Sequence, residues 1–126
     1  QTARFLQRSF PGERVLLNDI GAPSFLSDAR VVDLMGLANR ETAKARGMRI
    51  DRPLQKGTLE RLSVDAPVAV VYDEWFVFEM PKAWTKVGEF RTTGPNRVCA
   101  FPAVSVYATS QASLERTQKA FEGFRK

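Results

Sequence analysis

Histidine is absent from the chain, and cysteine occurs once, at Cys99. The first absence removes the commonest general base and the commonest zinc ligand of proteins. A single cysteine cannot form an internal disulfide or a thiolate metal site, and the apolar neighbours of Cys99 predict a small buried hydrophobic residue. The sequence therefore offers no pair of nucleophile and histidine base for covalent catalysis, and we assign no catalytic residue.

Long apolar runs and nucleotide-binding motifs are also missing. The longest apolar stretch is far shorter than the roughly 20 residues that a membrane-spanning helix needs. Gly21 and Gly36 do not belong to a GxGxxG fingerprint, and no P-loop, GxSxG elbow or HExxH motif occurs. None of the usual groups for nucleotide binding, serine hydrolysis or zinc-dependent hydrolysis can be assigned within these residues.

Blocks of like charge are absent as well. The net charge of +5 comes from 19 basic and 14 acidic residues, which are interleaved along the chain. A basic surface attracts phosphate, but a nucleic-acid interface usually concentrates its cations in a patch or stripe. The scattered charges indicate an ordinary solvated surface, and we expect no nucleic-acid partner.

The residues that are present predict one α/β domain covering residues 1–126. This length suffices for one core, and the hydrophobic content of 44% is ordinary for a globular protein. Continuous apolar runs at residues 15–17, 31–32 and 68–72 predict strands buried on both faces, which are typical of parallel sheets. About a dozen residues separate the first two runs, roughly the minimum for a parallel crossover.

Two later segments have a different pattern. Residues 86–92 and 104–108 alternate apolar and polar side chains, which predicts half-exposed strands that pair antiparallel beside the parallel core, with a turn at 93–96. Helices are expected near residues 3–10, 39–46 and 113–124. We therefore predict a three-layer fold whose mixed sheet has about five strands, three parallel plus an antiparallel pair, with flanking helices.

Acidic residues follow each predicted parallel strand, and they are the best candidate ligand site. They are Asp19, Asp33, Asp73 and Glu74. Because open α/β sheets bind ligands at the carboxyl edge of their strands, these carboxylates could hold a divalent cation such as Ca²⁺ or Mg²⁺, with no other cofactor expected. The alternative is that each one caps a helix or accepts hydrogen bonds from loop amides.

An aromatic segment follows the third strand. Trp75, Phe76, Phe78 and Trp84 could form a surface on which a sugar or a protein stacks. The alternative is that they pack in the core or cover the sheet. We include Trp75 and Trp84 with the acidic residues in the candidate ligand site.

Several short motifs resemble the water-soluble C-terminal region of bacterial multi-spanning membrane glycosyltransferases of the GT-C superfamily, which use polyprenyl-phosphate sugars, and of related uncharacterised membrane proteins. The motifs are NDIGA at residues 18–22, VDLMGL at 32–37, YDEWF at 72–76, the pair Pro81 and Trp84, and VSVY at 104–107. The resemblance covers about residues 13–108.

This resemblance implies that the chain is part of a larger membrane protein. The chain begins with Gln1 rather than methionine, and we therefore expect a fragment or a processed product. Its partners would be its own transmembrane region and a glycan or lipid-linked sugar, at the extracytoplasmic (periplasmic) face of the inner membrane. In such enzymes the catalytic acid lies near the first membrane helices, so the acidic residues here inherit no catalytic role from the match.

Two functions remain open on the sequence alone. The first is a non-catalytic soluble accessory domain of a membrane-embedded glycosyltransferase-like protein, which helps to position an acceptor or a partner. The alternative is a small stand-alone metal-assisted enzyme that uses the acidic sheet edge.

Overall fold

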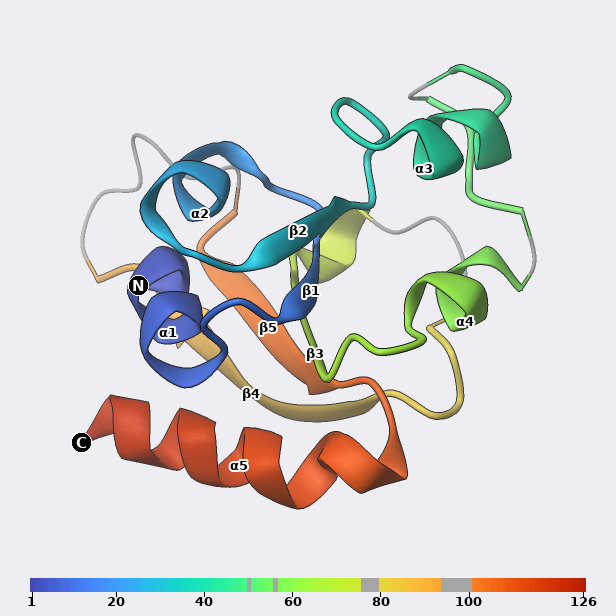
Figure 1. The fold of residues 1–126 in the computed structure, drawn as a ribbon. Coiled ribbons are helices and arrows are strands. Elements are labelled where there is room, and N and C mark those ends of the chain that lie inside the picture. The colour runs from blue at the N-terminus through green and yellow to red at the C-terminus, as the bar shows by residue number, and fades with distance from the viewer. Residues whose placement is uncertain (50, 56, 76–79, 94–100) are drawn as a thin grey trace.

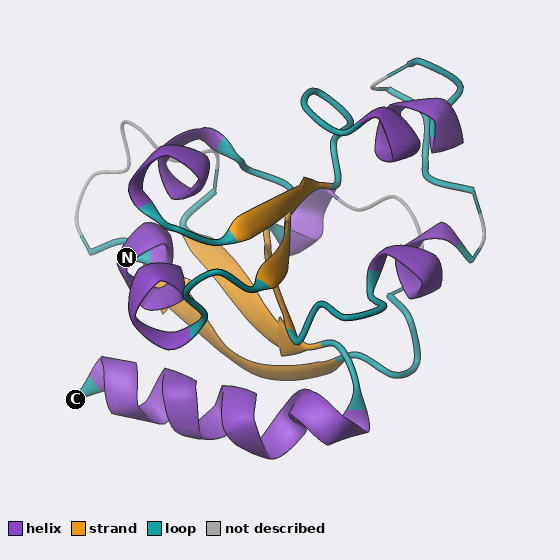
Figure 2. Cartoon of the chain, viewed as in Figure 1, coloured by secondary structure: helices purple, strands orange, loops and turns teal. Residues whose placement is uncertain are grey.

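The computed structural model describes residues 1–49, 51–55, 57–75, 80–93 and 101–126 (Figure 1). Helices and strands alternate up to residue 45, and a further helix then precedes the third strand (Figure 2). In order they are α1 (Thr2–Ser9), β1 (Arg14–Leu17), α2 (Gly21–Leu26), β2 (Arg30–Asp33), α3 (Arg40–Ala45), α4 (Thr58–Leu62), β3 (Val68–Val71), the 3₁₀ turn η1 (Asp73–Trp75), β4 (Thr85–Arg91), β5 (Ala103–Ala108) and α5 (Gln111–Arg125).

The sheet has five strands in the order β2-β1-β3-β5-β4. Strand β1 lies between β2 and β3 and is parallel to both, whereas β5 is antiparallel to β3 and to β4. The predicted α/β fold with a mixed sheet is confirmed. The apolar runs are a reliable sign of this fold because strands covered on both faces need apolar residues throughout. In β1, Val15, Leu16 and Leu17 have no exposed surface.

Two hydrophobic layers enclose the sheet. On one face, α1 and α5 cover β1, β3 and β4, with Phe5, Phe10 and Phe121 among the buried side chains. On the other face, the α4 segment covers β1 and β3, with Leu59 and Leu62 in the core. Alternate residues of each central strand contribute to the two layers, as the two-residue period of a strand requires.

Strand β5 differs from the prediction of a half-exposed strand. Residues 105–108 are all buried, because β5 lies between β3 and β4 rather than at an edge. Val106 packs in the layer below α5, and Tyr107 packs in the layer of α4. Only β4, at the edge of the sheet, shows the partial exposure that alternation predicted.

The longest helix, α5, begins with a capping box. Ser110 accepts a hydrogen bond from the backbone of Ser113, and the Ser113 side chain accepts one from the backbone of Ser110. Among the described residues, no helix combines the length and apolar character needed to span a bilayer. The predictions for Cys99, Phe76, Phe78 and residues 94–96 of the turn lie outside the described residues.

Candidate functional site

The three predicted aspartates follow neighbouring parallel strands and lie at one edge of the sheet. Asp33 is the last residue of β2, Asp19 follows β1 by two residues and Asp73 follows β3 by two residues. Since β2, β1 and β3 are adjacent and parallel, their carboxyl ends share an edge. The predicted placement on adjacent strands is confirmed, and the hydrogen bonds of each side chain decide what it does there.

Asp33 serves the loop that follows its own strand. Its side chain is buried, and its two carboxylate oxygens accept hydrogen bonds from the backbone amides of Met35 at 2.8 Å and Ala38 at 2.7 Å. The tight turn between these amides includes Gly36 at φ +82°, which favours glycine. Asp33 therefore has a structural role: its carboxylate accepts hydrogen bonds from loop amides, which was the alternative to ligand binding.

Asp19 is more open. Its side chain is exposed, and it accepts a long hydrogen bond of 3.4 Å from the backbone amide of Gly21 at the start of α2. The residue before it, Asn18, is buried and joins two strands: its Nδ2 donates to the Tyr72 carbonyl, and its Oδ1 accepts from the Tyr72 amide, each at 2.9 Å. The edge is thus braced by Asn18, which leaves Asp19 at the surface.

Asp73 is held by strands that are distant in sequence. Its carboxylate accepts hydrogen bonds from Ser105 Oγ at 2.6 Å and Tyr107 Oη at 2.9 Å, and it pairs with Lys86 Nζ at 3.3 Å. Ser105 and Tyr107 lie on β5 and Lys86 on β4. These bonds fold the η1 turn back over the sheet. Glu74, the next residue of the turn, is exposed.

This network shifts two pKa values. Burial, and then the hydrogen bond to the Asp73 carboxylate, raise the pKa of Tyr107 to about 12. Burial alone would lower the pKa of Lys86, but its bonds to Glu89 and Asp73 outweigh that effect and raise it. Tyr107 therefore stays a neutral donor and Lys86 a cation at neutral pH, which suits them to support the turn.

The predicted cation site finds no ligand set here. Within the part of the chain that the structure describes, no three acidic, histidine or cysteine side chains come close enough to hold a metal ion. The reason lies in the separate hydrogen bonds: Asp33 turns to the β2–α3 loop, Asp19 to the start of α2, and Asp73 to β5.

The two tryptophans occupy different environments. Trp84 is only 7% exposed, donates from Nε1 to Ser63 Oγ at 2.9 Å and packs against Tyr107 with ring centroids 5.8 Å apart. It is a core residue on the α4 face. Trp75 is half-buried, and its ring centroid lies 5.1 Å from that of Tyr72 and 6.3 Å from that of Phe101. The structure thus separates the two members of the predicted stacking pair.

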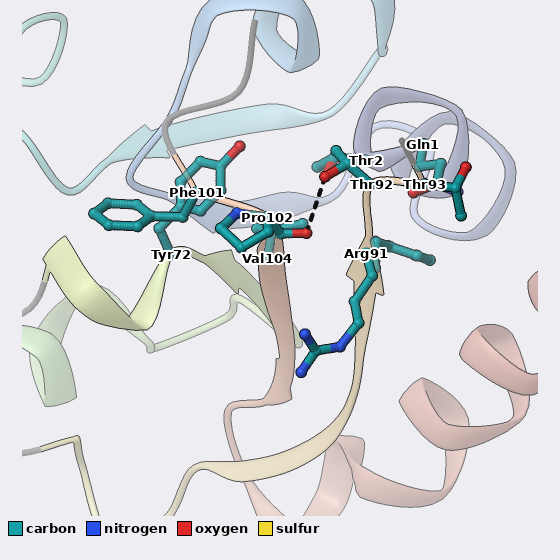
Figure 3. Close-up of a pocket in the computed structure, with 10 residues that line it drawn as sticks. Gln1, Thr2, Tyr72, Arg91, Thr92, Thr93, Phe101, Pro102 and Val104 are labelled. Atoms are coloured by element: carbon teal, nitrogen blue, oxygen red, sulfur yellow. Dashed lines mark hydrogen bonds between the residues drawn. The ribbon is translucent and has the colours of Figure 1, made fainter. Parts of the chain in front are cut away.

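A hollow of about 340 Å³ lies beside these aromatic rings, between the start of α1, the end of β4 and the start of β5. Figure 3 shows Tyr72 and Phe101 on one side of it and Thr2, Thr92 and Gln1 on the other. Thr92 Oγ1 donates to the Pro102 carbonyl at 3.3 Å across the two strand ends. The Arg91 side chain turns away from the hollow, toward its ion pair with Glu89.

A second hollow of about 250 Å³ extends the first along the same edge toward α2. Both are lined by Gln1, Thr2, Tyr72 and Val104, and the second also reaches Asp19 and Leu26. We call the two hollows together the edge groove; its members used below are Gln1, Thr2, Asp19, Tyr72, Thr92, Thr93 and Phe101. Of the predicted site residues, Asp19 lines the groove and Trp75 stands behind its aromatic wall.

A family model described as a domain of unknown function (DUF8728) matches residues 1–107. The chain belongs to the DUF8728 family. The match includes every residue of the edge groove and all five strands except the last residue of β5, whereas α5 lies outside it. No curated protein and no solved structure matches the chain.

The sequence did not reveal several residues that line the groove. Phe101 and Thr92 come from the ends of the antiparallel strands, and Gln1 comes from the start of α1. The predicted antiparallel pairing of residues 86–92 with 104–108 indicated that Thr92 and Phe101 would be neighbours, since it brings the end of one strand beside the start of the other. Their position at the carboxyl edge of the parallel strands could not be obtained without the strand order.

Proposed function

We propose that this DUF8728 domain is a non-catalytic accessory domain of a membrane-embedded glycosyltransferase-like protein, and that its edge groove binds a polyhydroxylated ligand such as a glycan acceptor. The single observation that carries the ligand assignment is the groove itself, which lies at the carboxyl edge of the parallel strands. Open α/β sheets bind their ligands there because loops and strand ends converge on that edge.

The chemistry of the groove suits a sugar. Tyr72 and Phe101, whose ring centroids lie 5.9 Å apart, give it an aromatic wall against which the apolar face of a sugar ring can pack. Thr92, Thr93 and Gln1 line the other part with hydroxyl and amide groups, which can exchange hydrogen bonds with sugar hydroxyls. A mixture of apolar surface and a few directed polar groups is typical of small-molecule sites.

The state of the polar network supports binding rather than turnover. A general base works best when its pKa lies near the operating pH, and Tyr107, with a pKa of about 12, does not meet that condition. Asp73 accepts two hydroxyl hydrogen bonds and an ion pair. The rival metal-assisted enzyme has less support, because the carboxylates it would use take separate partners among the described residues.

The membrane-embedded parent and the extracytoplasmic location rest on the motif resemblance alone. The reading frame around residues 1–126 tests them. We expect several apolar stretches of about 20 residues upstream, the length needed to cross a bilayer. A frame in which only a start methionine precedes these residues would overturn the proposed parent and leave the ligand proposal to its own test.

The ligand proposal is tested by presenting the purified chain to an array of neutral and acidic oligosaccharides and measuring the affinity for any hit by calorimetry. We expect binding that weakens about fivefold in Trp75→Ala, since removing an aromatic contact behind the wall costs about 1 kcal/mol. Trp84→Phe, on the other face of the sheet, is the matched control and should bind as the wild type does.

Incubation with a polyprenyl-phosphate-linked sugar completes the design. No consumption of the donor is expected. Turnover by the chain alone, abolished by Asp73→Asn, would replace the accessory role with a catalytic one. The absence of any bound oligosaccharide would remove the glycan assignment.

A further inference from the structure

Helix α3 and the segments beside it carry two large apolar side chains that face solvent. Leu37 is 71% exposed and Met48 is 75% exposed. Both lie near Ala43: a β-carbon at Gly36 would stand 3.0 Å from Ala43 Cα, and the Met48 amide donates to the Ala43 carbonyl at 2.8 Å. Figure 1 shows α3 and its flanking segments standing out from the body of the domain. We call Leu37, Arg40, Lys44 and Met48 the α3 tip.

The backbone conformation that holds Met48 in its exposed position is energetically unfavourable. Gly47 and Met48 have φ angles of +63° and +60°, and a left-handed conformation is unfavourable for a methionine. The guanidinium of Arg46 is buried below them; its Nε and Nη2 donate to the Leu34 carbonyl at 3.1 and 3.0 Å, and its Nη1 donates to the Arg52 carbonyl. The exposed methionine therefore stands on a braced loop.

Two exposed cations lie on α3, between Leu37 and Met48 in the sequence. Arg40 and Lys44 are both exposed and lie four residues apart on α3, so they share one face of the helix. Glu41 is the exposed acidic residue of the same helix, and in the following loop Asp51 is paired with Arg49 at 2.7 Å. Among the described residues, the helix between the two apolar side chains thus carries two exposed cations and one exposed anion, and a complementary partner would be anionic as well as apolar.

We propose that the α3 tip docks on the surface of an anionic lipid bilayer. Two projecting side chains are too small for a stable protein interface, which buries about 1,200–2,000 Å². A bilayer needs less area, because an apolar side chain can enter the acyl boundary while nearby cations contact anionic headgroups. The α3 tip follows the carboxyl end of β2, at the same edge of the sheet as the edge groove. The proposal does not depend on the ligand of that groove.

Vesicle cosedimentation tests the docking directly. The chain is mixed with phosphatidylcholine vesicles with and without phosphatidylglycerol. We expect binding to the anionic vesicles and little to the neutral ones. The double variant Arg40→Gln/Lys44→Gln should bind roughly 25-fold more weakly, at about fivefold for each charge near the surface. Leu37→Ser and Met48→Ser should each weaken binding about tenfold, from lost burial of an apolar side chain.

Matched controls separate the α3 tip from general basicity. Arg4→Gln/Arg8→Gln removes an equally spaced exposed pair from α1, and Val64→Ser removes an apolar side chain that is 62% exposed near the start of β3. Both should bind as the wild type does. Each variant is melted first, and if Met48→Ser is destabilised, Leu37→Ser carries the test.

Three outcomes would overturn the proposal. They are no binding to anionic vesicles, equal binding to neutral vesicles, or control variants that lose as much affinity as the α3 variants. Self-association of the chain that is lost in Leu37→Ser would assign the α3 tip to a protein contact and overturn the bilayer assignment as well.

Discussion

The side chain of Asn18 replaces one step of the β1–β3 ladder, and Asn18→Asp tests how the sheet edge is built. Asn18 both donates and accepts: Nδ2 donates to the Tyr72 carbonyl and Oδ1 accepts from the Tyr72 amide, each at 2.9 Å. Asn18 is 2% exposed and Tyr72 is 7% exposed, so water cannot replace either bond. An aspartate of the same shape can keep the bond from the amide, but its ionised carboxylate cannot donate to the carbonyl.

The expected loss is about 3 kcal/mol in the free energy of unfolding. The lost hydrogen bond costs about 1 kcal/mol, since the Tyr72 carbonyl keeps the Trp75 amide as a donor at 3.2 Å. The buried negative charge that would face this carbonyl adds about 2 kcal/mol. For a chain of 126 residues, each kcal/mol lowers the melting temperature by roughly 4 °C. The variant should therefore melt roughly 12 °C below the wild type at pH 7. A loss of about 3 kcal/mol is a large part of the free energy of unfolding of a typical domain.

The loss should depend on pH in a defined direction. When protonated, the new carboxyl can donate to the Tyr72 carbonyl as the amide did, so the folded state favours the protonated form. The pKa of that carboxyl is then higher in the folded than in the unfolded state, and the destabilisation is relieved as pH falls through the folded value. Melting curves of variant and wild type at pH 7 and pH 4 measure the difference, which should shrink at the lower pH.

Asn39→Asp is the matched control. Asn39 caps α3, and its Oδ1 accepts from the amides of Glu41 at 2.9 Å and Thr42 at 3.2 Å, a role that aspartate performs equally well. The control should change stability by less than about 0.5 kcal/mol, since a negative charge at a helix N-terminus is favourable. Equal losses in the two variants, or a loss at Asn18 that does not change between the two pH values, would refute the assigned donor and acceptor roles.

Two further predictions concern the sheet and the network beside the groove. Gly88→Ala should lower stability by about 1–3 kcal/mol in denaturant titration, because a β-carbon at Gly88 would lie 2.1 Å from the Phe121 ring; Gly123→Ala, where a β-carbon meets nothing within 4 Å inside α5, should instead stabilise by up to about 1 kcal/mol. Absorbance titration should show one tyrosine ionising near pH 12, assigned to Tyr107, and Asp73→Asn should lower that value. Since the unfolded tyrosine ionises near pH 10, stability should fall as pH rises from about 10 to 12, and loss over a lower range would contradict the assignment.

The fold was predictable from the sequence where burial on both faces leaves no choice of residue. The apolar runs of β1 and β3 predicted strands buried on both faces, and both strands are buried. The alternation at residues 104–108 is misleading, because Ser105 is a polar residue that is nevertheless buried: its hydroxyl donates to Asp73. The local sequence pattern shows which residues are polar but not which are buried. The burial of β5 follows from its place between two other strands.

The candidate site was predictable only in part, for a related reason. The edge on which the aspartates lie follows from strand direction alone, and that prediction is confirmed. The role of each aspartate depends on its partners. Asp33 finds them two and five residues away, but Asp73 finds them on β5, more than 30 residues away. No local spacing distinguishes the two cases, nor the buried Trp84 from the half-buried Trp75.

The segment that follows β3 connects the core to the groove, because its consecutive residues face different parts of the structure. Tyr72 lines the groove and is fixed through its backbone by Asn18, while Asp73 is tied to β5 on the α4 face. Trp75 then returns against the Tyr72 ring. A groove wall fixed from both faces of the sheet loses little conformational entropy when a ligand binds, which favours affinity. A ligand that binds only the folded state stabilises that state, so a ligand of this wall should raise the melting temperature of the whole domain rather than order one loop.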